Sequence, residues 1–145
     1  MKKVLSIFIV VLTVIFIAAS CGIYEDNNNG TALSWVPEKS GFKDYKIDKD
    51  KIMFCYSIYF INNDVDACEL SLAAKFEKSE LDGWFSFIDT DDEFLFGLDE
   101  NGRDKYIVLK PKEKKKVDFW FEGKYAGGKV NTNLSFPEYF SPTIY

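Results

Sequence analysis

Residues 52–61 read IMFCYSIYFI, and this run decides the fold class. Large apolar side chains recur at every second position: Ile52, Phe54, Tyr56, Ile58 and Phe60. Because side chains alternate between the two faces of a strand, this spacing predicts a β-strand with one fully apolar face. The opposite face is only partly polar, which places the strand in the middle of a fold rather than at its surface.

The next run, residues 68–76, has the same period. Its apolar positions are Cys68, Leu70, Leu72, Ala74 and Phe76. Between the two runs lies NNDVD, residues 62–66, and Asn and Asp are turn formers. The simplest interpretation is an antiparallel hairpin made of residues 52–61 and 68–76.

Shorter strands are predicted outward from this pair. One or two fall within residues 31–50, and others at residues 84–88, 94–98, 106–109, 117–122 and 130–136. Asn101-Gly102 is a strong hairpin signal, predicted to join residues 94–98 to 106–109. Seven or eight short strands with frequent turns, in a chain that is 17% aromatic, predict one all-β domain over residues 31–145: an immunoglobulin-like antiparallel β-sandwich.

The first twenty residues have a different character. Lys2 and Lys3 precede an apolar run over residues 4–19, and small residues lead to Cys21. This order of positive, apolar and small residues is typical of an export signal. The run is shorter than the roughly twenty residues that span a bilayer. An uncleaved anchor and cleavage without lipid are the alternatives, and each also predicts export.

Residues 17–21, Ile-Ala-Ala-Ser-Cys, resemble the lipobox of bacterial lipoproteins, with Ala18 where that family favours leucine. The resemblance implies lipid transfer to the Cys21 thiol, removal of residues 1–20, and a mature chain anchored to a bacterial membrane outside the cytoplasm. Residues 21–30, Asn-rich and bounded by glycine, are then a flexible tether. Gly22 is not the aspartate that marks inner-membrane retention, so the cell membrane and the outer membrane both stay open.

A second resemblance concerns the domain. A strand ending in Asn, followed by NNDVDACEL and later by VLKPKEKKKVDFWF, is similar to small immunoglobulin-like domains of bacterial lipoproteins. Those domains have a Pro-Gly-Glu turn where this chain has Pro111-Lys112-Glu113. The resemblance covers about half of the mature chain and implies a fold rather than an activity.

Charge and composition exclude several functions. Without Lys2 and Lys3 the chain keeps 16 basic and 23 acidic side chains, a net charge of −7, so nucleic acid is not an expected partner. The absence of histidine excludes His-based triads, His-ligated zinc and His general bases. We therefore expect no enzyme activity, no metal and no cofactor.

Cys55 and Cys68 are the two cysteines left after Cys21. Export permits a disulfide between them. The alternation places Cys55 opposite the main apolar face of its strand and Cys68 within an apolar face, so a bridge requires a bulge or a register change. Buried free thiols are the other interpretation.

Two charged stretches have competing interpretations. The acidic one contains Asp89, Asp91, Asp92, Glu93, Asp99, Glu100, Asn101 and Asp104, and is either a calcium site, a source of paired catalytic carboxylates or a set of solvated turns. The basic one contains Lys110, Lys112, Lys114, Lys115 and Lys116. It either contacts anionic lipid or cell-wall polymer or protects a strand edge from pairing, and edge protection is the favoured interpretation.

Trp120 is the candidate for a recognition surface. It points outward if Phe119 and Phe121 point inward, and it is predicted to combine with Tyr59, or with Tyr125 and the aromatic residues of the C-terminal tail. Cover by the tail or a loop is the alternative. The functional hypothesis is a membrane-anchored envelope lipoprotein that binds a protein or glycan. The alternatives are a protective inhibitor of an exported hydrolase or toxin, and a carboxylate-based glycan hydrolase.

Overall fold

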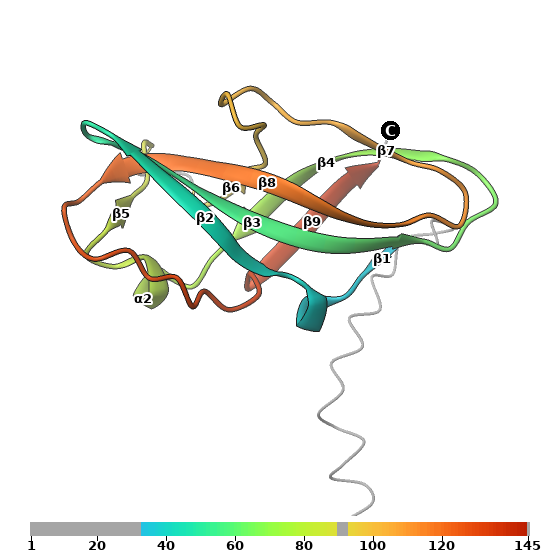
Figure 1. The fold of residues 1–145 in the computed structure, drawn as a ribbon, viewed down its shortest axis with the longest axis horizontal. Helices are drawn as coiled ribbons and strands as arrows, with labels where there is room; N and C mark the ends of the chain where they lie inside the picture. The colour runs from blue at the N-terminus through green and yellow to red at the C-terminus, as the bar shows by residue number, and fades with distance from the viewer. Residues whose placement is uncertain (1–32, 90–92, 145) are drawn as a thin grey trace, which may run out of the picture. The chain divides into compact units, whose positions relative to one another are not determined.

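The structure, a computed structural model, describes residues 33–89 and 93–144. These residues form an all-β sandwich of two antiparallel sheets, which confirms the predicted fold class. The elements are β1 (Leu33–Trp35), η1 (Pro37–Lys39), β2 (Gly41–Asp48), β3 (Lys51–Asn62), β4 (Cys68–Lys75), α2 (Lys78–Leu81), β5 (Phe85–Ser86), β6 (Leu95–Phe96), β7 (Ile107–Leu109), β8 (Lys114–Tyr125) and β9 (Tyr139–Ile144). Figure 1 shows the long strands β3 and β8 running side by side, crossed by β4 and β9 of the other layer.

The first sheet, called sheet A, is built around the β3–β8 ladder. β8 pairs with β3 from Lys51↔Lys124 to Ile61↔Lys114. β2 and β1 pair in succession with the other edge of β3, at residues 51–57 and 60–62. β5 pairs with the far edge of β8. β3 is therefore the central strand of this sheet, and residues on both of its faces are buried.

The second sheet, called sheet B, is built around β4. Leu70 pairs with both Ile144 of β9 and Ile107 of β7, and Ala73 pairs with both Ser141 of β9 and Phe96 of β6. Since a strand has only two edges, β6 and β7 lie one after the other along the edge opposite β9. They are two pieces of one edge strand, separated by an excursion over residues 97–106.

That excursion reaches sheet A. Leu98 forms an antiparallel bridge with Trp120 of β8, with a distance of 2.8 Å from the Leu98 amide to the Trp120 carbonyl and 3.0 Å in the reverse direction. Gly97 starts the departure, and a Cβ there would lie 2.5 Å from Cδ1 of Phe119. Only glycine therefore fits at this position without displacing a core ring.

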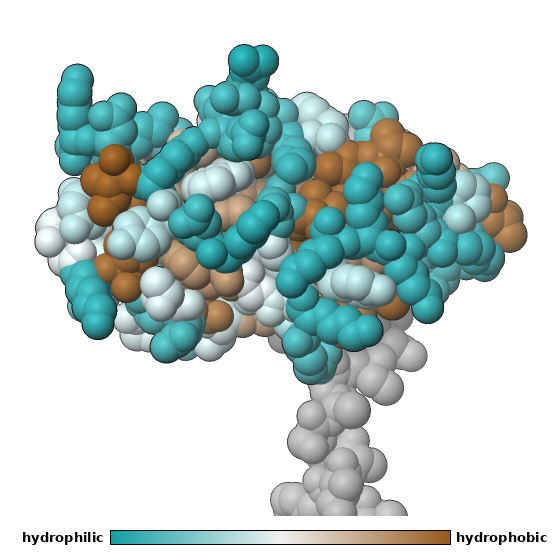
Figure 2. All heavy atoms as spheres, viewed as in Figure 1, coloured by the Kyte–Doolittle hydropathy of each residue, from teal (hydrophilic) through white to brown (hydrophobic). Residues whose placement is uncertain are grey.

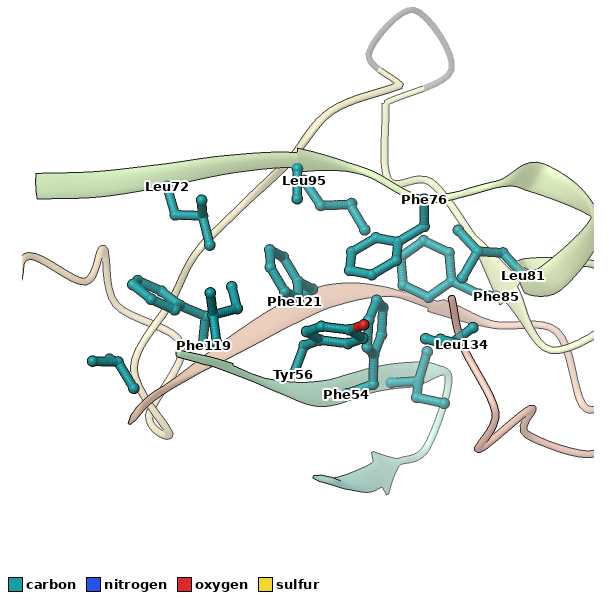
Figure 3. Packing of buried hydrophobic residues seen from close by; sticks show 14 of the residues in the cluster. Phe54, Tyr56, Leu72, Phe76, Leu81, Phe85, Leu95, Phe119, Phe121 and Leu134 are labelled. Atoms are coloured by element: carbon teal, nitrogen blue, oxygen red, sulfur yellow. The ribbon is translucent and has the colours of Figure 1, made fainter. Parts of the chain in front are cut away.

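The core is aromatic and lies between the sheets. Phe54 of β3 is fully buried, and its ring centroid lies 5.2 to 5.6 Å from four other rings, those of Phe76, Trp84, Phe85 and Phe121. Figure 3 shows Leu72 and Phe76 directed from one layer towards Tyr56, Phe119 and Phe121 of the other. Edge-to-face packing of this kind adds to the burial of apolar surface.

The predicted hairpin between residues 52–61 and 68–76 is wrong. β3 belongs to sheet A and β4 to sheet B, so residues 63–67 cross between the sheets. Asn62 holds the crossing: its Nδ2 donates to the carbonyls of Asp66 at 2.8 Å and Lys110 at 3.0 Å, and its Oδ1 accepts from the Asp64 amide at 2.9 Å. This buried amide satisfies backbone groups that a hairpin ladder would otherwise pair.

Several smaller expectations also need correction. The turn at Asn101-Gly102 is present, since Leu98 forms an antiparallel bridge with Asp104 across it, but the pairing does not extend to residues 106–109, because β6 and β7 both pair with β4. Residues 130–136 form no strand, although Val130 and Leu134 are buried. The C-terminal segment, predicted to be a tail, forms the strand β9. Of the strand predicted over residues 84–88, only residues 85–86 form a strand, β5. The described residues contain nine strands, against seven or eight predicted, and immunoglobulin-like connectivity stays a prediction.

Candidate binding surface

Trp120 lies on the outer face of sheet A, as predicted. It pairs with Cys55 in the β3–β8 ladder, while its neighbours Phe119 and Phe121 are fully buried on the inner face. The indole is half-buried, and Nζ of Lys46 lies 4.8 Å from its ring centroid. Lys46 also donates to the carbonyl of Glu100 in the 97–106 excursion. The indole is thus covered by a cation and a loop.

Tyr59 and Tyr125 do not extend this face into one aromatic surface. Tyr59 shares the outer face of β3 with Cys55, but Nζ of Lys39 sits 4.9 Å from its ring centroid. Tyr125 packs against the core, and its hydroxyl donates to the carbonyl of Gly128 at 2.9 Å. The structure therefore brings Trp120 and Tyr59 to one face, both half-buried, and leaves Tyr125 out of it.

Charged side chains cover the rest of this face. The Asp118 carboxylate accepts from Lys43 and from the Ser57 hydroxyl, and Lys51 pairs with Glu122 at 2.6 Å. Partial burial opposes ionisation of Asp118, but the bonds from Lys43 and Ser57 outweigh it and hold its pKa below the usual value. In the view of Figure 2, hydrophilic side chains spread widely over the molecule and apolar residues show as separate patches.

The two cysteines of the domain are free thiols. Cys55 is buried on the outer face of sheet A, and Cys68 is the first residue of β4 in sheet B. No bridge joins them, because Cys55 is on the outer face of sheet A and points away from sheet B, to which Cys68 belongs. Burial, together with the nearby Asp118 charge, raises the pKa of Cys55 to about 11, so this thiol stays protonated and unreactive at neutral pH.

The described acidic residues are engaged in turns and ion pairs. Asp99 Oδ1 accepts from the amides of Asn101 at 2.8 Å and Arg103 at 3.0 Å. Glu93 pairs with Lys75 and Lys78, and hydrogen bonds from these two lysines lower its pKa to about 2. Within residues 33–89 and 93–144, no three acidic or cysteine side chains converge on a point that could hold a metal ion. Asp91 and Asp92 lie outside the described residues.

The lysine stretch lies at one end of the sandwich. Lys114, Lys115 and Lys116 begin β8 and pair with Ile61, Phe60 and Tyr59 of β3. All five lysines are exposed. The strand predicted over residues 117–122 accordingly starts three residues earlier, because β8 already begins at Lys114.

The most open apolar surface lies on the outer face of sheet B. Phe96 pairs with Ala73 and Val108 pairs with Glu69, both outward-facing positions of β4. The rings of Phe94 and Tyr139 lie 5.1 Å apart. We call this set the aromatic ridge; its members and exposed fractions are Phe94 39%, Phe96 59%, Tyr106 54%, Val108 54% and Tyr139 49%.

A hollow of about 330 Å³ adjoins the ridge. It shares Phe94 and Phe96 with the ridge, and Phe87 and Ile88 form more of its apolar wall. Asp104 and Glu122 bring carboxylates to its rim. Small side chains lie beside the ridge on the sheet, since Ala73 pairs with both Phe96 and Ser141. A partner could therefore approach the backbone of sheet B closely.

Sequence reasoning missed the ridge because both sets of alternating positions in these strands are apolar. Leu95, Ile107 and Leu109 point inward, so the larger Phe96 and Tyr106 are left outside. The preference of small aliphatic residues for the inner face is the one signal that could have found it.

None of the helices in the described part of the chain is both long and apolar enough to cross a bilayer. No protein-family model matches the sequence, and no significant match exists among curated proteins or solved structures.

Proposed function

We propose that this chain is an exported, lipid-anchored protein of the bacterial envelope that binds another protein through the aromatic ridge of sheet B and catalyses no reaction. The observation that carries the proposal is the ridge itself, in which five large apolar side chains are between 39% and 59% exposed on one sheet. Several large apolar side chains exposed on one face of a folded domain are typical of a docking site.

The composition of the ridge favours a protein partner. Phenylalanine and tyrosine are enriched at protein interfaces, where they bury a large area with few rotatable bonds. Phe94, Phe96 and Val108 offer no hydrogen-bonding groups, whereas recognition of a glycan requires polar groups placed around the sugar hydroxyls. The core does not depend on these side chains, because Leu95, Ile107 and Leu109 fill the inner positions.

Anchoring is supported by the sequence alone. Lys2 and Lys3, the apolar run over residues 4–19 and the small residues before Cys21 are the pattern of a lipoprotein signal. A diacylglyceryl group with a further acyl chain would hold the mature protein stably, since stable anchoring takes two chains or a chain with a second signal.

Metabolic labelling tests the anchor. Cells that express the full-length protein are grown with an alkyne analogue of palmitate, and the protein is isolated and analysed for label. Wild type should carry label and Cys21→Ala should carry none. Equal labelling of the two, or an unlabelled wild type that retains its first twenty residues, would contradict lipidation.

Cross-linking on intact cells tests the ridge. Wild type should give a discrete cross-linked protein species, and a Phe96→Ala, Tyr106→Ala double variant should lose it. The matched control is Ile47→Ala, which also removes an exposed apolar side chain, 41% exposed, but from the edge strand β2. A species that survives in the double variant excludes the ridge. Retention of wild type on protein-free cell-wall glycan, lost in the same variant, would instead assign the ridge to a sugar polymer.

A further inference from the structure

The N-terminal end of the domain coincides with its lysine-rich end. Leu33, the first described residue, opens β1 and pairs with Asn62, at the end of β3. Ser34 of β1 and Lys114 of β8 both pair with Ile61, on opposite edges of β3. They are therefore two strand spacings apart, about 10 Å. Figure 1 shows β1 beginning at the end of the sandwich where β3 runs into β4 and β7 into β8.

We call this region the basic end and define it by five exposed lysines: Lys110, Lys112, Lys114, Lys115 and Lys116. Among the described carboxylates, none forms an ion pair with any of them. Two acidic residues of this end are used in turns instead. Glu113 Oε2 accepts from the Lys110 amide at 2.7 Å, and Asp64 Oδ1 accepts from the Val65 amide at 2.6 Å. A carboxylate keeps its charge when it accepts an amide hydrogen bond, so these two residues, with the exposed Asp66 and Glu69 nearby, offset part of the lysine charge and leave a small net positive charge at this end.

The two loops at the basic end are fastened to each other. The amide of Lys112 donates to the carbonyl of Asp64 at 3.2 Å, and its ammonium donates to the carbonyl of Asn63. Val65 lies at the tip of the loop between β3 and β4 and is 72% exposed. The end thus combines a cluster of cations with a protruding apolar side chain, the two chemistries that a lipid surface with anionic headgroups accepts.

We propose that the domain docks with its basic end on the anionic phospholipid headgroups of the membrane that holds it. This inference rests on the lipid anchoring proposed above. Twelve residue steps separate Cys21 from Leu33, a reach of at most about 40 Å for extended chain. The chain joins the domain at the basic end, so the anchor would keep these lysines within that distance of the lipid surface.

The charge distribution favours one orientation. The mature chain carries a net charge of −7, and the acidic remainder of the domain is repelled by the same headgroups that attract the basic end. Docking by this end keeps Phe96 and Tyr139 of the aromatic ridge away from the lipid surface, because they pair with residues 73 and 75 at the far end of β4, whereas Val108 pairs with Glu69 near the basic end. Most of the ridge then stays accessible to the protein partner proposed above.

Vesicle co-sedimentation tests the docking without any need for lipidation. Residues 31–145 form a compact unit of their own, so the chain from residue 21 onward, with Cys21→Ser, contains the whole domain. It should sediment with vesicles of phosphatidylglycerol and phosphatidylcholine in equal parts, and not with phosphatidylcholine alone. Binding should weaken as salt is raised, because exposed charges are screened.

Charge-matched variants locate the surface. The variant Lys114→Gln, Lys115→Gln, Lys116→Gln should bind at least roughly tenfold more weakly. The control, Lys49→Gln, Lys124→Gln, Lys129→Gln, removes the same charge from the opposite end and should bind like wild type. Val65→Ser should weaken binding to a smaller extent. Far-ultraviolet spectra verify folding, and Lys110→Gln, Lys112→Gln serves as a second variant if the triple change unfolds the domain.

The outcomes separate the two proposals. Palmitate labelling of Cys21 together with equal vesicle binding by both triple variants would overturn docking and leave the anchor intact. Vesicle binding through the basic end by a protein that takes up no label would retain the lipid-binding surface and overturn the anchor. Self-association of the Lys114–Lys116 variant without any change in vesicle binding would show that these lysines only protect the edge of β8, and docking would be rejected.

Discussion

The outer faces of the two sheets differ in how far their apolar side chains are exposed, although both faces carry aromatic residues. On sheet A, Met53 and Cys55 are at most 5% exposed, and Trp120 lies beneath Lys46. On sheet B, Phe96 and Val108 remain more than half exposed. The difference arises from what lies above each sheet. Long charged side chains and the 97–106 excursion cover sheet A, whereas on sheet B the small Ala73 of β4 and Ser141 of β9 lie beside Phe96 and leave it open.

This contrast shows that an outward-pointing aromatic residue is not by itself a binding surface. Lysine side chains carry long apolar stems, and they can cover a ring while their charge stays in water. Trp120 is therefore covered by other parts of the fold, whereas Phe96 is exposed in the way that a binding residue would be. The following changes test that distinction.

The largest loss of stability is expected for a change at Asn62, because this residue joins the two sheets at the basic end. Without that connection the outer faces of the two sheets could not be compared. Asn62→Ala removes the buried amide that bridges the β3–β4 crossing and the β7–β8 turn. The backbone carbonyls of Asp66 and Lys110 lose their partner, at a cost of about 2–4 kcal/mol. Urea unfolding monitored by tryptophan fluorescence measures it. A loss below about 0.5 kcal/mol would show that water replaces the amide.

The burial of Cys55 should make the stability of the domain depend on pH in the alkaline range. Its pKa is raised from 9.0 to about 11 by burial, so the unfolded thiol ionises first and stability falls as the pH rises from about 9 to about 11. The full effect is about 3 kcal/mol, since each pKa unit corresponds to about 1.4 kcal/mol. Cys55→Ala should flatten this part of the pH dependence. Cys68→Ala is the control and should change it less, because Cys68 is only partly buried. Identical profiles for wild type and Cys55→Ala would mean that the thiol is open to water.

Trp120→Ala should destabilise the domain by about 1–2 kcal/mol, less than a core aromatic, since the indole is half-buried and interacts with Lys46. The same change should also admit thiol reagents to Cys55, its ladder partner. Thermal unfolding and the rate of iodoacetamide labelling are the two measurements. An unchanged melting temperature together with an unchanged labelling rate would remove the claim that Trp120 covers this face.

Phe96→Ala should have the smallest effect on stability, within about 0.5 kcal/mol of wild type, because the ring is 59% exposed on sheet B. Its effect should appear only in binding of the protein partner proposed for the ridge. Equilibrium unfolding of this variant beside Trp120→Ala makes the comparison direct. If Phe96→Ala is the more destabilising of the two, the ridge belongs to the fold and not to an interface.

The sequence correctly predicted which side chains of a strand are buried, but it did not predict which strands are neighbours in a sheet. The alternation in residues 52–61 identified the buried positions of β3, because period two is a local property of a strand. It could not identify the neighbour of β3, since a five-residue turn serves equally for a hairpin and for a crossing between sheets. Asn62 makes the crossing, and its role depends on carbonyls nearly fifty residues away, at Leu109 and Lys110.

The candidate site was predicted only in part for a related reason. The outward direction of Trp120 followed from the buried Phe119 and Phe121 on either side. The cover supplied by Lys46 and by residues 97–106 comes from distant segments, which no local pattern shows. Nor does a local pattern show that residues 94–96 and 106–109 form one edge, because their alignment exists only along β4.

Sheet B has a consequence of its own for local opening. Each described ladder of this sheet, to β6, to β7 and to β9, has β4 as one of its two strands. Detachment of β4 would thus release the ridge and the C-terminal strand in one event, as a single cooperative unit. The amide protons of β6, β7 and β9 should then exchange with deuterated solvent with a shared opening free energy, lower than that of the β3–β8 pair.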